Sequence, residues 1–200
     1  MAQVELKQTP LFQQHQDLKA RMMGFGGWDM PVQYKSITAE HQSVRQQAGM
    51  FDISHMGKFL LQGKALREQL QALVPSDLQP GQAKYSVFLN PEGGIIDDLI
   101  FYYEGQNAAG LEQGKLIVNA STTDKDKAWL LEHCSEQELG FEDVSAERVL
   151  IAVQGPKGVE ILQSLTPTDL SAVGNYRHQT GTILDPVSYT HLTLPTIYSV

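Results

Sequence analysis

"YSVFLNPEGGIIDDLIFYY", residues 85–103, is the stretch that predicts the centre of the fold. Residues 84–89 are rich in strand formers, "NPEGG" supplies turn residues, and "IIDDLIFYY" gives the returning strand of a β-hairpin. Asp97 and Asp98 interrupt this second strand, where aspartate is depleted and a buried carboxylate is costly unless it is paired. The hairpin therefore raises the question of what the two carboxylates do.

The two aspartates are expected on opposite faces, because successive side chains in a strand alternate. Asp98 shares its face with Ile96, Ile100 and Tyr102, and Asp97 shares the other with Ile95, Leu99, Phe101 and Tyr103. They cannot form a carboxylate dyad, so at most one of them is expected to take part in the chemistry of a site. Two interpretations stay open: both are solvated or paired at the wet end of the strand, or one faces a cavity beside aromatic rings.

The second interpretation predicts a ligand slot. Tyr85 on the partner strand and Tyr102 on the Asp98 face would form an apolar slot with hydroxyl tips, which suits a flat heteroaromatic ligand. Asn119 shares a face with Ile117 on a third predicted strand. Its amide can donate and accept, which suits the edge of a pterin-like or purine-like ring.

Helices and strands alternate irregularly around the hairpin. Ser36 can cap a helix over residues 37–48, with Gly49 as its C-terminal stop. The other predicted helices cover residues 11–23, 64–74, 122–134 and the segment after "GPKG", and the other strands cover 58–61, 115–120 and 148–153, the last one buried. This order predicts an α+β fold rather than a doubly wound parallel sheet.

The composition is that of an ordinary globular protein. Of 200 residues, 42% are hydrophobic and 19% are charged, and the formal net charge of −8 argues against a nucleic-acid partner. The single Cys134 excludes a disulfide framework and a multi-thiolate metal site. No signal peptide or membrane-spanning segment is expected, which favours a cytoplasmic protein.

Several weaker motifs favour structural roles. His55 has no second ligand at metal-binding spacing, so we expect a loop or packing role and no metal. "GPKG" lacks the phosphate-loop pattern, and "GFGG" has no predicted strand before it, so both are expected to be plain turns or loops. Ser54 and Ser121 have no evident base partner. The charged helix over residues 124–133 is expected to present a solvated face.

Seven motifs in a fixed order give a resemblance that extends from about Thr9 to about Asp185. They are "TPLFQQH", "GFGGWDMPVQY", "GMFDISHMG", "YSVFLNPEGGIIDDLI", "VNAS", "KD" and "AVQGP". Together they resemble the aminomethyltransferases of the glycine cleavage system, the T proteins. Related folate-binding modules occur in dimethylglycine and sarcosine dehydrogenases and in an iron–sulfur maturation factor, but the first three motifs favour the glycine cleavage family.

The resemblance implies a fold and a reaction. The fold would comprise folate-binding aminomethyltransferase-type domains with antiparallel or mixed sheets and flanking helices. Tetrahydrofolate, as co-substrate, would take the methylene of an aminomethyl group carried on the lipoyl arm of the H protein. Ammonia would leave and 5,10-methylenetetrahydrofolate would form. Alternatives are a folate-dependent demethylase-type module and a non-catalytic folate-binding factor of the same superfamily.

The resemblance also implies site residues. The family's catalytic aspartate corresponds to Asp98, and its folate contacts correspond to Met56, Tyr85, Asp98, Tyr102, Ile117 and Asn119. A carboxyl with an ordinary pKa of about 3.9 is ionised at neutral pH and is a poor proton reservoir. Asp98 is therefore expected to stabilise positive charge and to orient a folate nitrogen, while Asp97 is expected to be structural.

The sequence departs from the family near Asp185. The expected continuation, with "GYTGE" and "GLGARD", is absent, so the second-half folate contacts have no counterparts here. Residues 1–186 are expected to be an incomplete N-terminal, folate-binding part, which can comprise two interleaved subdomains. Residues 187–200 resemble the translation of a sequencing adapter and are expected to form no domain, although their pattern alone would predict one more strand.

Overall fold

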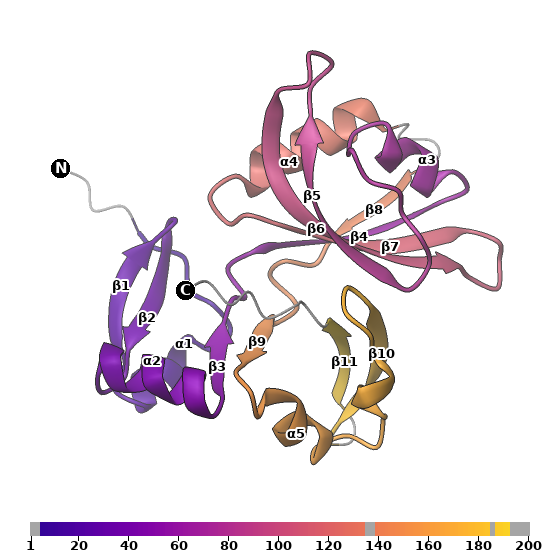
Figure 1. Cartoon of the computed structure of the whole chain (residues 1–200). Helices are drawn as coiled ribbons and strands as arrows, with labels where there is room; N and C mark the ends of the chain where they lie inside the picture. Colours follow the sequence, from indigo (N-terminus) through magenta and orange to yellow (C-terminus); the bar gives the residue numbers. More distant parts are fainter. Residues whose placement is uncertain (1–4, 135–138, 185–186, 193–200) are drawn as a thin grey trace.

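A computed structural model describes residues 5–134, 139–184 and 187–192 of the chain, the last six as backbone only. Its centre is a five-stranded antiparallel sheet with the strand order β5-β6-β7-β4-β8 (Figure 1). The strands are β4 (Gly57–Gly63), β5 (Gln82–Leu89), β6 (Ile95–Gln106), β7 (Glu112–Val118) and β8 (Leu139–Asp143). The predicted hairpin is confirmed as β5–β6, and the α+β class is confirmed.

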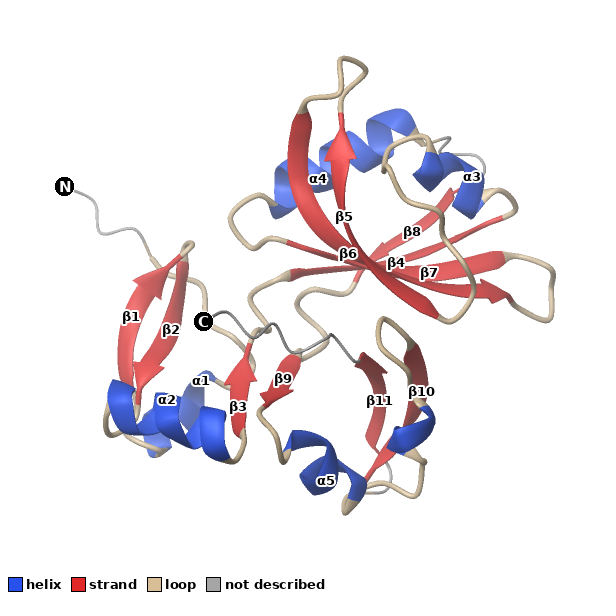
Figure 2. Cartoon of the chain, viewed as in Figure 1, coloured by secondary structure: helices blue, strands red, loops and turns tan. Residues whose placement is uncertain are grey.

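One face of this sheet is the main core. Leu99, Phe101 and Tyr103 alternate along β6 and are almost fully buried, as the strand period requires. Helices α3 (Leu66–Gln71) and α4 (Thr123–His133) cover this face, which Figure 2 shows as blue helices on one side of the red sheet. The leucines predicted for α3 pack into the same core.

The first part of the chain differs from the prediction of one helix over residues 11–23. Helix α1 (Phe12–Asp17) ends early, Lys19 has a left-handed φ of 59°, and β1 (Arg21–Phe25) pairs with β2 (Trp28–Gln33). Gly24 and Phe25 of "GFGG" end β1, so the prediction that no strand precedes this motif was wrong. Gly26 and Gly27, both with positive φ, form the hairpin turn, which agrees with the predicted loop.

Helix α2 (Ile37–Gln46) is confirmed with its predicted cap. The Ser36 hydroxyl accepts a hydrogen bond from the Ala39 amide at 3.3 Å. Glu40 reinforces this start, because its Oε1 accepts from the backbone amides of residues 34–36 at 2.7–3.0 Å. Gly49 does not adopt the left-handed C-cap conformation; it is the first residue of β3 (Gly49–Asp52).

The remaining elements follow β3 and β9 and lie below the central sheet in Figure 1. Strand β3 pairs with β9 (Ile151–Gln154), which is followed by α5 (Gly158–Gln163), a 3-10 turn (Leu170–Ala172) and β10 (His178–Ile183). The predicted strand over 148–153 exists but is half-exposed rather than buried, because only β3 is paired with it in a two-stranded sheet.

The segment that was expected to stand outside the fold contributes one strand. The backbone of β11 (Val187–Leu192) pairs antiparallel with β10 in a two-stranded sheet. Residues 185–186 and 193–200 lie outside the described residues, so the predicted boundary at 186 falls among them. Whether residues 187–200 belong to the natural protein stays a prediction.

Candidate functional site

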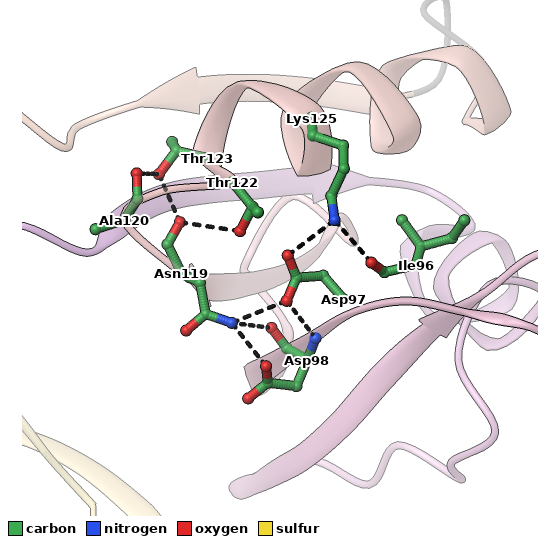
Figure 3. A network of polar contacts seen from close by, with 8 residues as sticks. All are labelled: Ile96, Asp97, Asp98, Asn119, Ala120, Thr122, Thr123 and Lys125. Atoms are coloured by element: carbon green, nitrogen blue, oxygen red, sulfur yellow. Dashed lines mark hydrogen bonds and ion pairs between the residues drawn. The ribbon is translucent and has the colours of Figure 1, made fainter. Parts of the chain in front are cut away.

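The two aspartates lie where strand β6 begins beside the end of strand β7. Leu99 on β6 faces Val118 on β7, so Asp98 and Asn119 are the next residues beyond that pair (Figure 3). The Asn119 Nδ2 lies 2.7 Å from Asp98 Oδ1 and 2.9 Å from Asp97 Oδ1. One amide therefore holds both carboxylates, although the strand directs them to opposite faces.

The second oxygen of Asp98 also has a partner. The Tyr85 hydroxyl on β5 donates to Asp98 Oδ2 at 2.7 Å. This hydrogen bond, with smaller effects of burial and of the negative charge on Asp98, raises the pKa of Tyr85. Asp98 is half-buried. The hydrogen bonds from Tyr85 and Asn119 fix its carboxylate in one orientation.

Asp97 is held as a carboxylate by a different set of partners. Its Oδ2 lies 3.1 Å from the Lys125 ammonium, and its Oδ1 accepts from the Asp98 amide at 2.8 Å. Burial opposes its ionisation, but hydrogen bonds from Thr122, Asn119, the Asp98 amide and Lys125 outweigh burial and hold the pKa of Asp97 well below its usual range. Asp97 is a fixed anion that ties β6 to helix α4.

The start of helix α4 is anchored to the same corner. The Asn119 carbonyl accepts from the Thr123 hydroxyl at 2.8 Å, and Lys125 Nζ donates to the Ile96 carbonyl at 2.7 Å, as Figure 3 shows. The helix begins after Thr122, without a side-chain cap bond. These contacts fix the backbone of Asn119 to the start of α4 and the start of β6 to Lys125.

Four of the predicted site residues share the sheet face that lies opposite α3 and α4. The register pairs Tyr85 with Ile100 and Ile100 with Ile117, which places these three residues in one row across the sheet. Asp98 and Tyr102 lie on the same face, one pleat to either side of Ile100 along β6. These four residues therefore lie on one face of the sheet.

Tyr102 contacts a residue that the sequence did not suggest. Its ring packs edge-on against the His178 ring of β10, with centroids 5.5 Å apart, and burial raises the pKa of Tyr102 to about 12. His178 Nε2 lies 3.1 Å from the Tyr103 carbonyl, and burial lowers the pKa of His178, so its imidazole is neutral at pH 7. No local signal marks His178, because it is separated from Tyr102 by more than seventy residues.

An open hollow of about 480 Å³ lies beside Asp97 and Asn119. It is lined by Phe25, Gly26, His55, Met56, Asp97, Asn119, Ala120, Ser121 and Thr122. Among the predicted site residues, Met56 and Asn119 line it, whereas Tyr85, Asp98, Tyr102 and Ile117 do not. The structure therefore divides the predicted set between the hollow and the adjoining sheet face, with Asn119 touching both.

The hairpin tip and the β3–β4 loop form the other walls of this hollow. Phe25 at the tip is exposed and packs edge-on against His55, with ring centroids 5.8 Å apart. Burial lowers the pKa of His55, so its imidazole is neutral at pH 7. Among the described residues, no group of three His, Cys, Asp or Glu side chains is placed to hold a metal ion.

Asp126 on α4 is fully buried, whereas Asp124, Lys125 and Glu132 on the same helix are exposed, as the predicted solvated face requires. Burial, together with the nearby negative charge of Asp97, raises the pKa of Asp126 to about 6. The spacing of Asp126 from Leu130, four residues later on the same helical face, was the sequence signal that could have revealed its burial.

Comparison with known proteins shows what this chain is similar to. The family model of the GCVT N-terminal domain matches residues 11–187. An aminomethyltransferase from Nostoc sp. is 54% identical over 92% of this chain and 50% of its own length. One from Rippkaea orientalis is 56% identical over 90% of this chain and 49% of its own length. The chain spans about half the length of the curated relatives it matches.

A solved structure agrees with these sequence matches. The crystal structure of glycine cleavage system aminomethyltransferase T from Bartonella henselae superimposes with a TM-score of 0.78 at 32% sequence identity. The match covers 89% of this chain and 48% of that one. Among the described residues, no helix is both long and apolar enough to cross a membrane.

Proposed function

The chain belongs to the GCVT N-terminal domain family, and we propose that it is the N-terminal, folate-binding half of a glycine cleavage aminomethyltransferase. The family match over residues 11–187 supports the assignment of residues 1–186 to that half and leaves 187–200 almost wholly outside it. The parent enzyme in this proposal is about twice as long, as the relatives are.

The proposed reaction moves one carbon. The substrate is an S-aminomethyl-dihydrolipoyl group on the H protein, and tetrahydrofolate is the acceptor. The C–S and C–N bonds of the aminomethyl carbon break, ammonia and the dihydrolipoyl thiol leave, and the carbon becomes the methylene bridge of 5,10-methylenetetrahydrofolate. The proposed location is the cytoplasm, which the single free thiol of Cys134 supports.

Asp98 is the proposed catalytic residue. As C–N cleavage gives the carbon iminium character, a fixed carboxylate stabilises the positive charge and accepts a hydrogen bond from a folate nitrogen. Asn119 at 2.7 Å and Tyr85 at 2.7 Å hold Asp98 in one orientation, so little reorganisation is needed during the reaction. This carboxylate, held by hydrogen bonds from Asn119 and Tyr85, is the observation that carries the proposal.

The other proposed folate contacts shape the surface on which the ligand would bind. Tyr102 and Ile117 supply apolar surface on the Asp98 face, and Met56 supplies it in the hollow, where exclusion of water would protect an iminium from hydrolysis. Asn119 contacts both surfaces, so it can present its amide to the edge of the pterin ring. Asp97 is given a structural role, because its ion pair with Lys125 balances its charge and ties β6 to helix α4.

The test is an assay of the parent enzyme with tetrahydrofolate and a lipoyl carrier loaded with the aminomethyl group. Folate-dependent release of ammonia, with formation of 5,10-methylenetetrahydrofolate, is the expected result. Tight folate binding without ammonia release would instead indicate a non-catalytic folate-binding factor. Turnover of an N-methylated amine in place of the carrier would indicate a demethylase module.

A further inference from the structure

A buried lysine supports the loop that forms one wall of the hollow. Lys58 lies on β4 directly opposite Ile117 of β7, so its side chain stands on the same sheet face as Asp98. Only 5% of Lys58 is exposed, and burial lowers the pKa of its ammonium, although the charges of Asp52 and Asp143 oppose that shift. Burying a lysine is costly, so its contacts need an explanation.

The Lys58 ammonium binds the two ends of one short segment. It donates to the Ser54 carbonyl at 2.7 Å and to the Met56 carbonyl at 2.9 Å. The segment is a tight turn, because the Met56 amide donates to the Ile53 carbonyl at 3.1 Å. The ammonium therefore fills the inside of the turn and satisfies carbonyl groups that the turn directs inward.

Other side-chain anchors hold the beginning of this turn. Asp52 Oδ1 accepts from the Ser54 amide at 2.9 Å, and the Ser54 hydroxyl accepts from the Leu150 amide at 2.9 Å. Among the side-chain contacts described for residues 54–56, that of Lys58 is the one that reaches both Ser54 and Met56. Loss of the ammonium would leave the Met56 end without this support.

Residues 54–56 border the hollow. This segment carries His55 and Met56 to the wall of the hollow, where His55 also packs against Phe25 of the β1–β2 hairpin. We propose that Lys58 is a positioning residue whose ammonium fixes residues 54–56 in the conformation that shapes the hollow. Its consequence for folate affinity rests on the proposed function, whereas the fixation of the loop does not.

The fixation is tested on the chain itself by amide hydrogen exchange of Lys58→Met, which keeps most of the aliphatic stem and removes the ammonium. The matched control is Lys127→Met, since Lys127 forms a more exposed ion pair with Asp143 at 3.3 Å, away from the hollow. We expect the amides of residues 54–57 to exchange about tenfold faster in Lys58→Met alone. Unchanged exchange in this segment would overturn the inference.

A measurement on the wild-type chain decides the matter if Lys58→Met does not fold. The ¹H–¹⁵N spectrum of lysine ammonium groups should contain one slowly exchanging signal, assigned to Lys58, because buried and hydrogen-bonded ammonium protons exchange slowly with water. If the Lys58 signal exchanges as fast as those of exposed lysines, the ammonium is not bound to the two carbonyls and the inference fails.

Folate binding by the parent enzyme separates this inference from the proposed function. We expect Lys58→Met to raise the Kd for tetrahydrofolate about tenfold, whereas Lys127→Met should leave this Kd unchanged. Wild-type binding with an equal Kd for Lys58→Met would refute the positioning role. Absence of folate binding in the wild type would refute the proposed function, and hydrogen exchange would still decide whether Lys58 fixes the loop.

Discussion

Asn119 donates its side-chain amide to Asp98 across neighbouring strands, with 2.7 Å between Asn119 Nδ2 and Asp98 Oδ1. The same nitrogen lies 2.9 Å from Asp97 Oδ1, so one neutral donor lies between two carboxylates. This arrangement lets adjacent aspartates remain on opposite faces of a strand and still act as one structural unit. It also separates their roles, because Asp97 has a lysine partner and Asp98 has a tyrosine partner.

Replacement of Asp98 by Asn should remove catalysis and retain folate binding. The Asn side chain can still accept from Asn119, so the corner keeps its geometry while the negative charge is lost. We expect kcat of the parent enzyme to fall by about 10² to 10³, the usual effect of removing one charge-stabilising group. Ammonia release measures the rate and calorimetry measures folate binding; equal turnover by the variant would refute the assigned role.

Replacement of Asp97 by Asn should chiefly affect stability. Because its folded pKa is depressed, the contribution of Asp97 is present above its unfolded pKa of about 3.8 and is lost as the pH falls through the folded value. We expect a loss of about 1 kcal/mol at pH 7 that disappears in strong acid. Urea unfolding at several pH values checks this, and a rate defect as large as that of Asp98→Asn would contradict the division of roles.

Replacement of Tyr85 by Phe tests the second support of Asp98. The hydroxyl donates to Asp98 Oδ2 at 2.7 Å, but Tyr85 is 61% exposed, so water can replace part of the lost interaction. We expect kcat to fall about three- to tenfold with little change in Tm. Tyr176→Phe, which removes another exposed hydroxyl, is the control, and a fall of similar size in that variant would mean that the effect is not specific.

Replacement of Asp126 by Asn should stabilise the fold at alkaline pH. The folded pKa of about 6 lies above the unfolded value of 3.8, so the folded state binds more protons between these values. Its favourable contribution is therefore complete below about pH 3.8 and is lost as the pH rises through 6. At pH 8 the variant should gain up to about 3 kcal/mol, and the gain should shrink by pH 4. A gain independent of pH would contradict the shifted titration.

Replacement of Asp52 by Ala should destabilise the junction between α1 and β3. The side chain of Asp52 is 1% exposed, and its Oδ2 accepts from Thr9 at 2.6 Å and lies 2.9 Å from His15 Nε2. Removing it leaves buried donors without an acceptor, for which we expect a loss of about 2 to 4 kcal/mol in urea unfolding. Asp17→Ala, at an exposed site on α1, should cost less than about 0.5 kcal/mol.

Local sequence patterns predicted the parts of the fold that depend on local geometry. Alternation along residues 95–103 gave the hairpin and the opposite directions of Asp97 and Asp98, because side chains in a strand have a period of two. The same approach failed at residues 18–25, where Met22 fits either a helical or a strand pattern. The positive φ of Lys19 and pairing with β2 decide for the strand, and neither is evident from spacing.

The sequence by itself determined the α+β class, the central hairpin, and the strand face that carries Asp98, Ile100 and Tyr102. Only the tertiary structure brought Asn119 onto both carboxylates, His178 onto Tyr102, and the buried Lys58 beneath the loop of the hollow. The physical reason is that direction along a strand is set by neighbouring residues, whereas burial and hydrogen bonding depend on segments that meet only when the chain has folded.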